Sequence, residues 1–238
     1  TNYGPIGAIW FDGLWDQPDD FNWGLDKQYA LIHKLQPACL IGNNHHKSPF
    51  PGEDFQMFER DLPGENKAGL SGQSISTLPL ETCETMNGMW GYKIKDQNYK
   101  SVNELIHLLV RAAGKGANLL MNIGPQPNGE LPAVAVERLK GVGEWMSKYG
   151  ETIYGSTSGN VVTASWGTTT RKGNTLYIHI LSQKMPEFVT LPLNEKVISA
   201  TLFDTGEKVK YEKIQGGIVL HTANLKPSVD CIISLKLK

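Results

Sequence analysis

The sequence predicts an α/β region followed by an all-β region. Up to about residue 155, apolar runs typical of strands alternate with segments of helical periodicity, as in the βα units of a parallel sheet. Beyond that point, short β-rich runs are separated by Gly, Asn, Asp or Pro turns. We therefore expect residues 1–155 to form a partial (β/α)8-type barrel of about four βα units, and residues 156–238 to form a C-terminal antiparallel β-sandwich. Because a closed barrel has eight strands, an open parallel sheet is the alternative.

Strands and helices alternate in the first region. The expected strands span residues 7–12, 38–44, 76–84 and 117–125. Apolar positions from Leu25 to Leu35 predict the first helix, which ends before Pro37. The second helix begins at a capping box formed by Ser101 and Glu104, and the third begins at Pro132. Residues 45–72 are predicted to be a loop of a length that usually indicates a functional role.

The second region contains only strand-like runs. They span residues 161–166, 175–181, 188–193, 197–203, 208–213, 217–222 and 230–237. Residues 149–160 lie before them and are predicted to be the boundary between the two domains.

Composition and charge exclude several classes of function. The net charge is −1 and Lys and Arg are spread along the chain, so we expect no nucleic-acid partner. No apolar run approaches the roughly 20 residues of a membrane helix, and the N-terminal residues do not resemble a signal peptide. Three cysteines at long spacings match neither a disulfide framework nor a metal site, and no phosphate-binding motif is present. We therefore expect a neutral partner, no cofactor and no metal.

Polar and aromatic groups follow each expected strand of the α/β region. Asp12 ends the first strand, and the other strands end in "GNNHH", "LETCETMNGMWGY" and "NIGPQPNGE". In a parallel sheet these ends meet at one rim, where carboxylates, amides and tryptophans suit the binding and hydrolysis of sugars. The alternative is that Asp12 merely forms a turn with Gly13. His45 and His46 are adjacent, and in a strand they would point to opposite faces, which argues against a metal pair.

Several of these segments are similar to a known family. In order and spacing, "IWFDGLWD", "GNNHH", "DFQMFERDLPGE", "LETCETMNGMWGY", "GANLLMNIGPQPNGELP" and "GEWMSKYGETIYG" resemble the retaining α-L-fucosidases of glycoside hydrolase family 29. In that family a (β/α) barrel carries the chemistry and a β-sandwich follows it. The resemblance implies a fucosylated glycan or glycoside as substrate, hydrolysed through a covalent fucosyl-enzyme intermediate. It also implies a secreted or periplasmic location.

The resemblance assigns roles to individual residues. Asp12 corresponds to the nucleophile, and Glu59 corresponds to the acid/base, with Glu53 and Glu65 as the alternatives. Trp10 and Trp90 are expected to line the fucose pocket, where Trp90 meets the C5 methyl group. His45 occupies the place where many relatives have a sugar-binding Arg, and we expect it to bind substrate.

Relatives of this family have roughly half of the barrel before the nucleophile strand. An open half-barrel would expose strand edges and apolar faces, so we expect an oligomer or an association with the missing half. The function predicted is α-L-fucosidase activity. The alternative is a noncatalytic relic or a carbohydrate-binding module in which Asp12 and Glu59 have no catalytic role.

Overall fold

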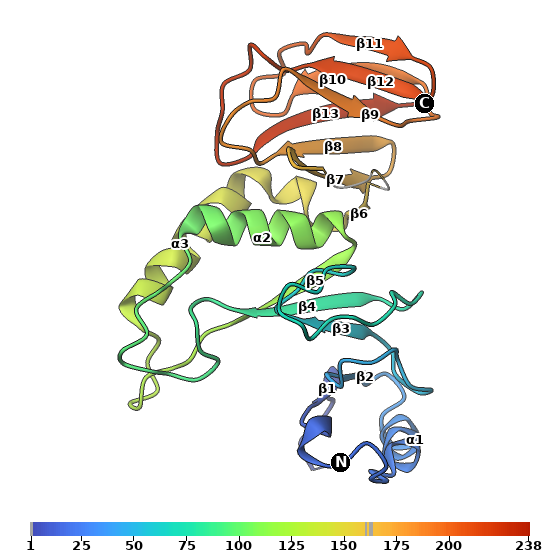
Figure 1. Cartoon of the computed structure of the whole chain (residues 1–238), viewed down its shortest axis with the longest axis vertical. Coiled ribbons are helices and arrows are strands. Elements are labelled where there is room, and N and C mark those ends of the chain that lie inside the picture. The colour runs from blue at the N-terminus through green and yellow to red at the C-terminus, as the bar shows by residue number, and fades with distance from the viewer. Residues whose placement is uncertain (1, 160, 162–163) are drawn as a thin grey trace. The chain divides into compact units, whose positions relative to one another are not determined.

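Short strands dominate the chain, and most of them are antiparallel. A computed structural model describes residues 2–159, 161 and 164–238 (Figure 1). The chain divides into two units, one made of Thr1–Thr85 and Ala117–Asn122, and the other made of Met86–Gly116 and Ile123–Lys238. The expected boundary between domains near residue 155 remains a prediction.

The first unit contains two small parallel sheets. Its elements are β1 (Ala8–Phe11), η1 (Leu14–Asp16), α1 (Leu25–Leu35), β2 (Leu40–Asn43), β3 (Gln56–Glu59), β4 (Leu80–Thr85) and β5 (Ala117–Asn122). Strand β1 pairs with β2, and β3 pairs with β4, which pairs with β5. The register places Glu59 of β3 opposite Cys83 of β4, and Cys83 opposite Leu120 of β5, so these three side chains share one face of their sheet.

Strand β3 is the strand of this unit that the sequence analysis missed. Its four residues are all buried, so its sequence shows no alternation of polar and apolar positions. Side chains of the following loop bond to it. The Gln73 amide donates to the Met57 carbonyl at 2.8 Å, and the Ser71 hydroxyl donates to the Glu59 carbonyl at 3.2 Å. These contacts, together with β4, make a strand of a segment that we expected to be loop.

The second unit contains two antiparallel sheets and two helices. The helices are α2 (Val102–Gly114) and α3 (Ala133–Tyr149), followed by η2 (Gly150–Thr152). The strands are β6 (Thr157–Ser158), β7 (Gly167–Lys172), β8 (Thr175–Ile180), β9 (Phe188–Leu191), β10 (Val197–Leu202), β11 (Tyr211–Ile214), β12 (Gly217–His221) and β13 (Cys231–Leu237). One sheet has the order β10-β13-β8-β7-β6, and the other has the order β11-β12-β9.

Two apolar clusters hold this unit together. The first joins the two sheets, with Ile178 and Leu235 from one sheet and Val189 and Leu220 from the other. The second joins α2 and α3, which lie next to the five-stranded sheet in Figure 1, to that sheet. Its members include Val110 of α2 and Trp145 of α3. Every expected strand from residue 175 onward has an observed counterpart. Strand β7 was not expected, and the expected strand 161–166 contains residues 162 and 163, which lie outside the described residues.

Two helical glycines give a prediction about packing in this unit. A Cβ on Gly114, the last residue of α2, would lie 2.0 Å from Oγ1 of Thr168 on β7, whereas a Cβ on Gly143 in α3 would have no neighbour within 4 Å. We expect Gly114→Ala to lower the free energy of unfolding by about 1–3 kcal/mol, because overpacking outweighs the gain in helix propensity. Gly143→Ala should raise it by about 0.5–1 kcal/mol. Urea unfolding of both variants measures the difference, and equal effects would contradict this account of the contact between α2 and β7.

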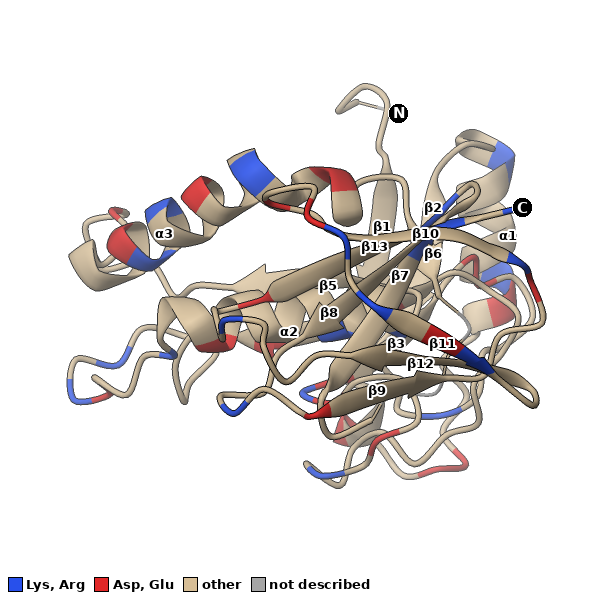
Figure 2. Cartoon of the chain, turned by 90° about the horizontal axis from the view of Figure 1, so that it is seen from above, with Lys and Arg blue, Asp and Glu red and all other residues tan. Residues whose placement is uncertain are grey.

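Charged residues are mixed rather than segregated by sign. Figure 2 shows acidic and basic residues interleaved along α3. In the part of the chain that the structure describes, no helix is both long enough and apolar enough to cross a membrane.

Candidate active site

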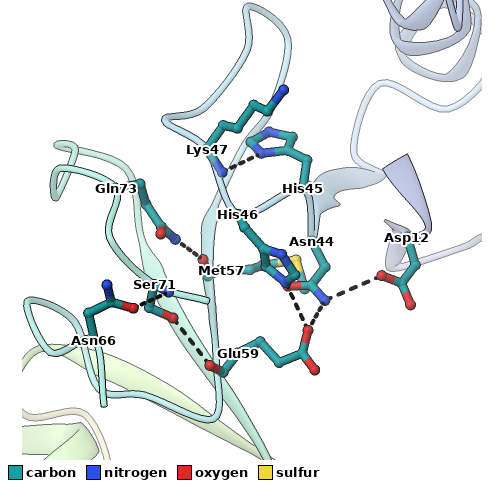
Figure 3. A network of polar contacts seen from close by, with 10 residues as sticks. All are labelled: Asp12, Asn44, His45, His46, Lys47, Met57, Glu59, Asn66, Ser71 and Gln73. Atoms are coloured by element: carbon teal, nitrogen blue, oxygen red, sulfur yellow. Dashed lines mark hydrogen bonds and ion pairs between the residues drawn. The ribbon is translucent and has the colours of Figure 1, made fainter. Parts of the chain in front are cut away.

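Two carboxylates and one amide meet at the ends of strands from the two parallel sheets. Asp12 follows β1, Asn44 follows β2, and Glu59 is the last residue of β3. The Nδ2 atom of Asn44 donates to Oδ1 of Asp12 at 3.3 Å and to Oε2 of Glu59 at 2.8 Å (Figure 3). Because one atom contacts both oxygens, these oxygens are at most about 6 Å apart, a range that includes the ~5–5.5 Å separation of carboxyl groups in retaining glycosidases.

An imidazole completes the surroundings of Glu59. Nε2 of His46 lies 2.8 Å from Oε2 of Glu59, so the amide and the imidazole converge on the same carboxylate oxygen (Figure 3). The indole of Trp15 stacks on the His46 ring with centroids 4.9 Å apart and an interplanar angle of 1°. The side chains of His46 and Glu59 are 21% and 12% exposed, so the pair is sheltered and still reachable from solvent.

The backbone is strained at His46 and at the residue that follows Glu59. His46 has φ 59° and Arg60, directly after Glu59, has φ 57°, and these are the described non-glycine residues with positive φ. Such conformations are disfavoured for L-residues, and they cluster at functional sites. The Arg60 amide donates to the Cys83 carbonyl at 2.8 Å, which fixes the turn that ends β3.

Cys83 and Glu81, on the strand next to β3, both have a raised pKa. Burial, together with the charges of Glu59, Glu81 and Asp12, raises the pKa of the Cys83 thiol to about 12. Burial also raises the pKa of the Glu81 carboxyl. Cys83 is therefore a neutral thiol at physiological pH and is unsuited to act as a nucleophile.

The two alternatives to Glu59 occupy different surroundings. Glu53 has a buried side chain, and its Oε1 accepts from the Tyr29 hydroxyl at 2.9 Å and lies 3.0 Å from Nε2 of His45. Burial and the Glu53 carboxylate in turn raise the pKa of Tyr29. Glu65 pairs with Lys67 at 2.7 Å. No contact that the structure describes links Glu53 or Glu65 to Asp12.

The side chain of His45 is buried and contacts Glu53, Lys47 and Phe50. Its Nδ1 accepts from the Lys47 amide at 3.0 Å, so its Nε2 carries the proton and donates to Glu53. Its ring packs against Phe50 with centroids 4.2 Å apart, and its side chain is 2% exposed. The structure therefore places His46, and not His45, beside the candidate catalytic carboxylates.

The two predicted pocket tryptophans lie in different units. Trp10 is on β1, is 38% exposed, and shares its face of the strand with Ala8. Trp90 belongs to the second unit, between β4 and α2, so its place beside fucose remains a prediction.

Three residues of this site had no assigned role in the sequence analysis: Asn44, His46 and Trp15. The signal for the first two was present in "GNNHH", because polar residues directly after a parallel strand lie at the active-site rim. Groups of three or more His, Cys, Asp or Glu side chains placed to hold a metal ion are absent among the described residues.

Comparison with known proteins gives one family. The family described as Alpha-L-fucosidase matches residues 1–151. Tissue alpha-L-fucosidase of Mus musculus is 31% identical over 207 residues, which cover 81% of this chain and 43% of that protein. Alpha-L-fucosidase of Dictyostelium discoideum is 30% identical over 246 residues, which cover 95% of this chain and 51% of that protein.

A solved structure gives the same result. Alpha-L-fucosidase isoenzyme 1 from Paenibacillus thiaminolyticus is 32% identical, with a TM-score of 0.80 over 100% of this chain and 59% of that chain. The chain thus spans about half the length of the curated relatives that it matches. The strands and the few helices of this chain are arranged as in that solved fucosidase. Because the family model also matches residues 1–151, the chain belongs to the α-L-fucosidase family.

Proposed function

We propose that this chain carries the catalytic pair of a retaining α-L-fucosidase. The observation that supports this most directly is the Asn44 amide, which contacts both Asp12, after β1, and Glu59, at the end of β3. Two carboxyl groups at this separation suit a double displacement at a glycosidic bond. The alternative, a noncatalytic relic or binding module, accounts for neither this pairing nor the relatives, which are enzymes.

In the first step, Asp12 is the nucleophile. Its carboxylate attacks the anomeric carbon of fucose and forms a β-fucosyl ester, while the bond to the leaving oxygen breaks. Glu59 gives its proton to that oxygen. The contacts of Asn44 and His46 with the Glu59 carboxyl group are both to Oε2, so we assign the transferred proton to Oε1.

In the second step, Glu59 acts as the base. It takes a proton from a water molecule, which attacks the anomeric carbon and releases Asp12. The product is fucose with its original α configuration, because each step inverts the anomeric centre once. The Asn44 amide contacts both side chains and so fixes the position of one relative to the other.

Variants of the two carboxylates test this assignment with fucosides of graded leaving-group acidity. We expect Glu59→Gln to lower kcat/KM for a fucosyl disaccharide by about 10²–10⁴-fold and to lower kcat/KM for 4-nitrophenyl α-L-fucoside much less, because kcat/KM reports the first step and nitrophenolate leaves without a proton. Asp12→Asn should slow both substrates, since both need the nucleophile. If Glu59→Gln lowers kcat/KM equally for both substrates, Glu59 is not the acid, and Glu53 and Glu65 would be tested in the same way.

His46 is proposed as a positioning residue that orients Glu59 through the 2.8 Å contact. We expect His46→Ala to lower kcat/KM by about 10–100-fold on the disaccharide, with a smaller loss on the nitrophenyl fucoside, because kcat/KM reports the step in which Glu59 acts as acid. The matched control is His33→Ala, because His33 lies 2.9 Å from Asp54 in a similar pair away from the site. A loss that does not depend on the leaving group would contradict this role.

The architecture proposed is a partial (β/α) barrel followed by a β-sandwich. The parallel strands β1 to β5 would form part of the barrel wall, and the two antiparallel sheets of the second unit would form the sandwich. Strand residues Trp10, Leu40 and Leu120 are 38%, 50% and 45% exposed, which supports the proposal that further chain covers these strands. We propose that the 238-residue chain self-associates through these exposed strand residues, and sedimentation of the purified chain should then show an oligomer rather than a monomer.

A further inference from the structure

Four buried side chains are joined by hydrogen bonds at the end of β2. The Asn43 amide donates to the Tyr29 hydroxyl at 2.7 Å, and this hydroxyl donates to Oε1 of Glu53 at 2.9 Å. Nε2 of His45 donates to the same oxygen at 3.0 Å. We call these four side chains the buried network. The reaction described above uses none of them.

The buried network and the candidate active site take alternate residues of one turn. Asn43 and His45 belong to the buried network. Asn44 and His46 follow them in the chain, and both contact the Glu59 carboxyl group. Figure 3 shows Asn44 and His46 directed toward that carboxyl group and the His45 ring directed away from it. The buried network therefore holds the residue that precedes each of these two site residues.

The backbone conformation of His46 needs support from its surroundings. Its φ of 59° is disfavoured for a residue with a Cβ atom, so the turn keeps it because neighbouring contacts outweigh the cost. His45 supplies such contacts. Its Nδ1 accepts from the Lys47 amide at 3.0 Å, a bond that spans His46, and its ring packs on Phe50 with centroids 4.2 Å apart.

The buried network is anchored to regular elements of the first unit. Tyr29 belongs to α1, and its ring lies edge to face with that of Phe11 on β1, with centroids 5.2 Å apart. Asp54, directly after Glu53, donates its amide to the Ile41 carbonyl of β2 at 2.7 Å. The four network residues are at most 7% exposed. They are therefore placed to influence the reaction through the turn and not by touching substrate.

We propose that the buried network positions His46 for acid catalysis, by holding the turn in the conformation that places Nε2 of His46 against Glu59. This proposal rests on the proposed function, because it takes Glu59 as the residue that protonates the leaving oxygen. Tyr29 links the two ends of the network, since its hydroxyl accepts from Asn43 and donates to Glu53. Tyr29 and Glu53 are thus positioning residues that act through His46.

Tyr29→Phe tests the proposal, because it removes one hydroxyl group and keeps the ring that packs on Phe11. We expect kcat/KM for a fucosyl disaccharide to fall by about 3–10-fold, as for the loss of one hydrogen bond, with a smaller fall for 4-nitrophenyl α-L-fucoside. A merely structural role would lower kcat/KM equally for both substrates.

The matched control is Tyr177→Phe. Tyr177 is 3% exposed, and its hydroxyl also donates to a carboxylate, that of Glu151 at 3.0 Å, but the pair lies in the second unit. We expect this variant to show no difference between the two substrates. Equal selectivity for leaving groups in the Tyr29→Phe and Tyr177→Phe variants would overturn the proposal.

A double-mutant cycle shows whether the buried network acts through His46. In the His46→Ala background, Tyr29→Phe should change kcat/KM for the disaccharide by less than about twofold, because the side chain that the network positions is gone. The same loss in both backgrounds would contradict the proposal, since it would show that Tyr29 acts by another route.

Nitrogen-15 NMR of the histidine side chains tests the positioning without turnover. The chain has six histidines, and the His46 resonances are identified by their loss in His46→Ala. We expect Tyr29→Phe to shift the Nε2 resonances of His45 and His46, and Tyr177→Phe to shift neither. Unchanged His46 resonances in Tyr29→Phe would overturn the proposal and leave the fucosidase assignment intact. If they shift as expected and no fucoside is hydrolysed, the proposed function fails and the positioning of His46 by the network stands.

Discussion

Replacing Asp12 by glycine should lower the rate of 4-nitrophenyl α-L-fucoside hydrolysis by at least about a thousandfold, because no nucleophile remains to form the ester. Added azide should restore turnover and identify the step that was lost. Azide enters the space left by the carboxylate and attacks the anomeric carbon as nitrophenolate departs. The expected product is β-fucosyl azide, with inverted configuration, measured by NMR of the isolated sugar.

The matched control is Glu59→Gly with the same azide. In that variant Asp12 still forms the ester, and azide replaces water in the second step, so the product should be α-fucosyl azide with retained configuration. Opposite configurations from the two variants would separate the nucleophile from the acid/base. A retained product from the Asp12→Gly variant, or hydrolysis within tenfold of the original rate, would show that Asp12 is not the nucleophile.

Loss of the buried pair between His179 and Asp230 should have the largest effect on stability. Nδ1 of His179 lies 2.7 Å from Oδ2 of Asp230, and both side chains are fully buried. Nε2 lies 3.0 Å from Oγ1 of Thr170, whose own proton goes to the Thr152 carbonyl. Both ring nitrogens of His179 thus contact buried polar partners, the Asp230 carboxyl group and the Thr170 hydroxyl group.

We expect His179→Ala to lower the free energy of unfolding by about 3–5 kcal/mol, because it leaves the Asp230 carboxylate buried without its partner. The matched control is His221→Ala. His221 also pairs with a carboxylate, that of Glu212, at 3.0 Å, but the pair is partly exposed, so the loss should be about 0–1 kcal/mol. Urea unfolding compares the two variants. Equal losses would show that burial of the His179 pair contributes nothing beyond a surface contact.

The sequence predicts the positions of those candidate-site residues that directly follow an apolar strand. Asp12 and Asn44 follow apolar runs, and the carboxyl ends of parallel strands meet at one rim whatever the details of packing. Glu59 was predicted from resemblance alone, because β3 has no sequence periodicity and is a strand only through its neighbours. The long loop expected over residues 45–72 therefore contains a sheet element, and Glu59 is at the end of a strand.

The directions of the His45 and His46 side chains could not be predicted from the sequence. We treated His45 and His46 as part of an extended run, but β2 ends at Asn43 and His46 has φ 59°. The backbone turn sends His45 toward Glu53 and His46 toward Glu59. Which of two adjacent histidines reaches the site depends on this turn, and no periodic pattern encodes it.

The most direct test of the central claim is mass spectrometry after incubation with 2-fluoro-fucosyl fluoride. The fluorine at C2 slows the second step more than it slows the first, and fluoride leaves without a proton, so the ester accumulates. We predict a single added 2-fluorofucosyl group, located by peptide mapping on Asp12. A label on any other residue, or no label in a preparation that hydrolyses 4-nitrophenyl α-L-fucoside, would contradict the account.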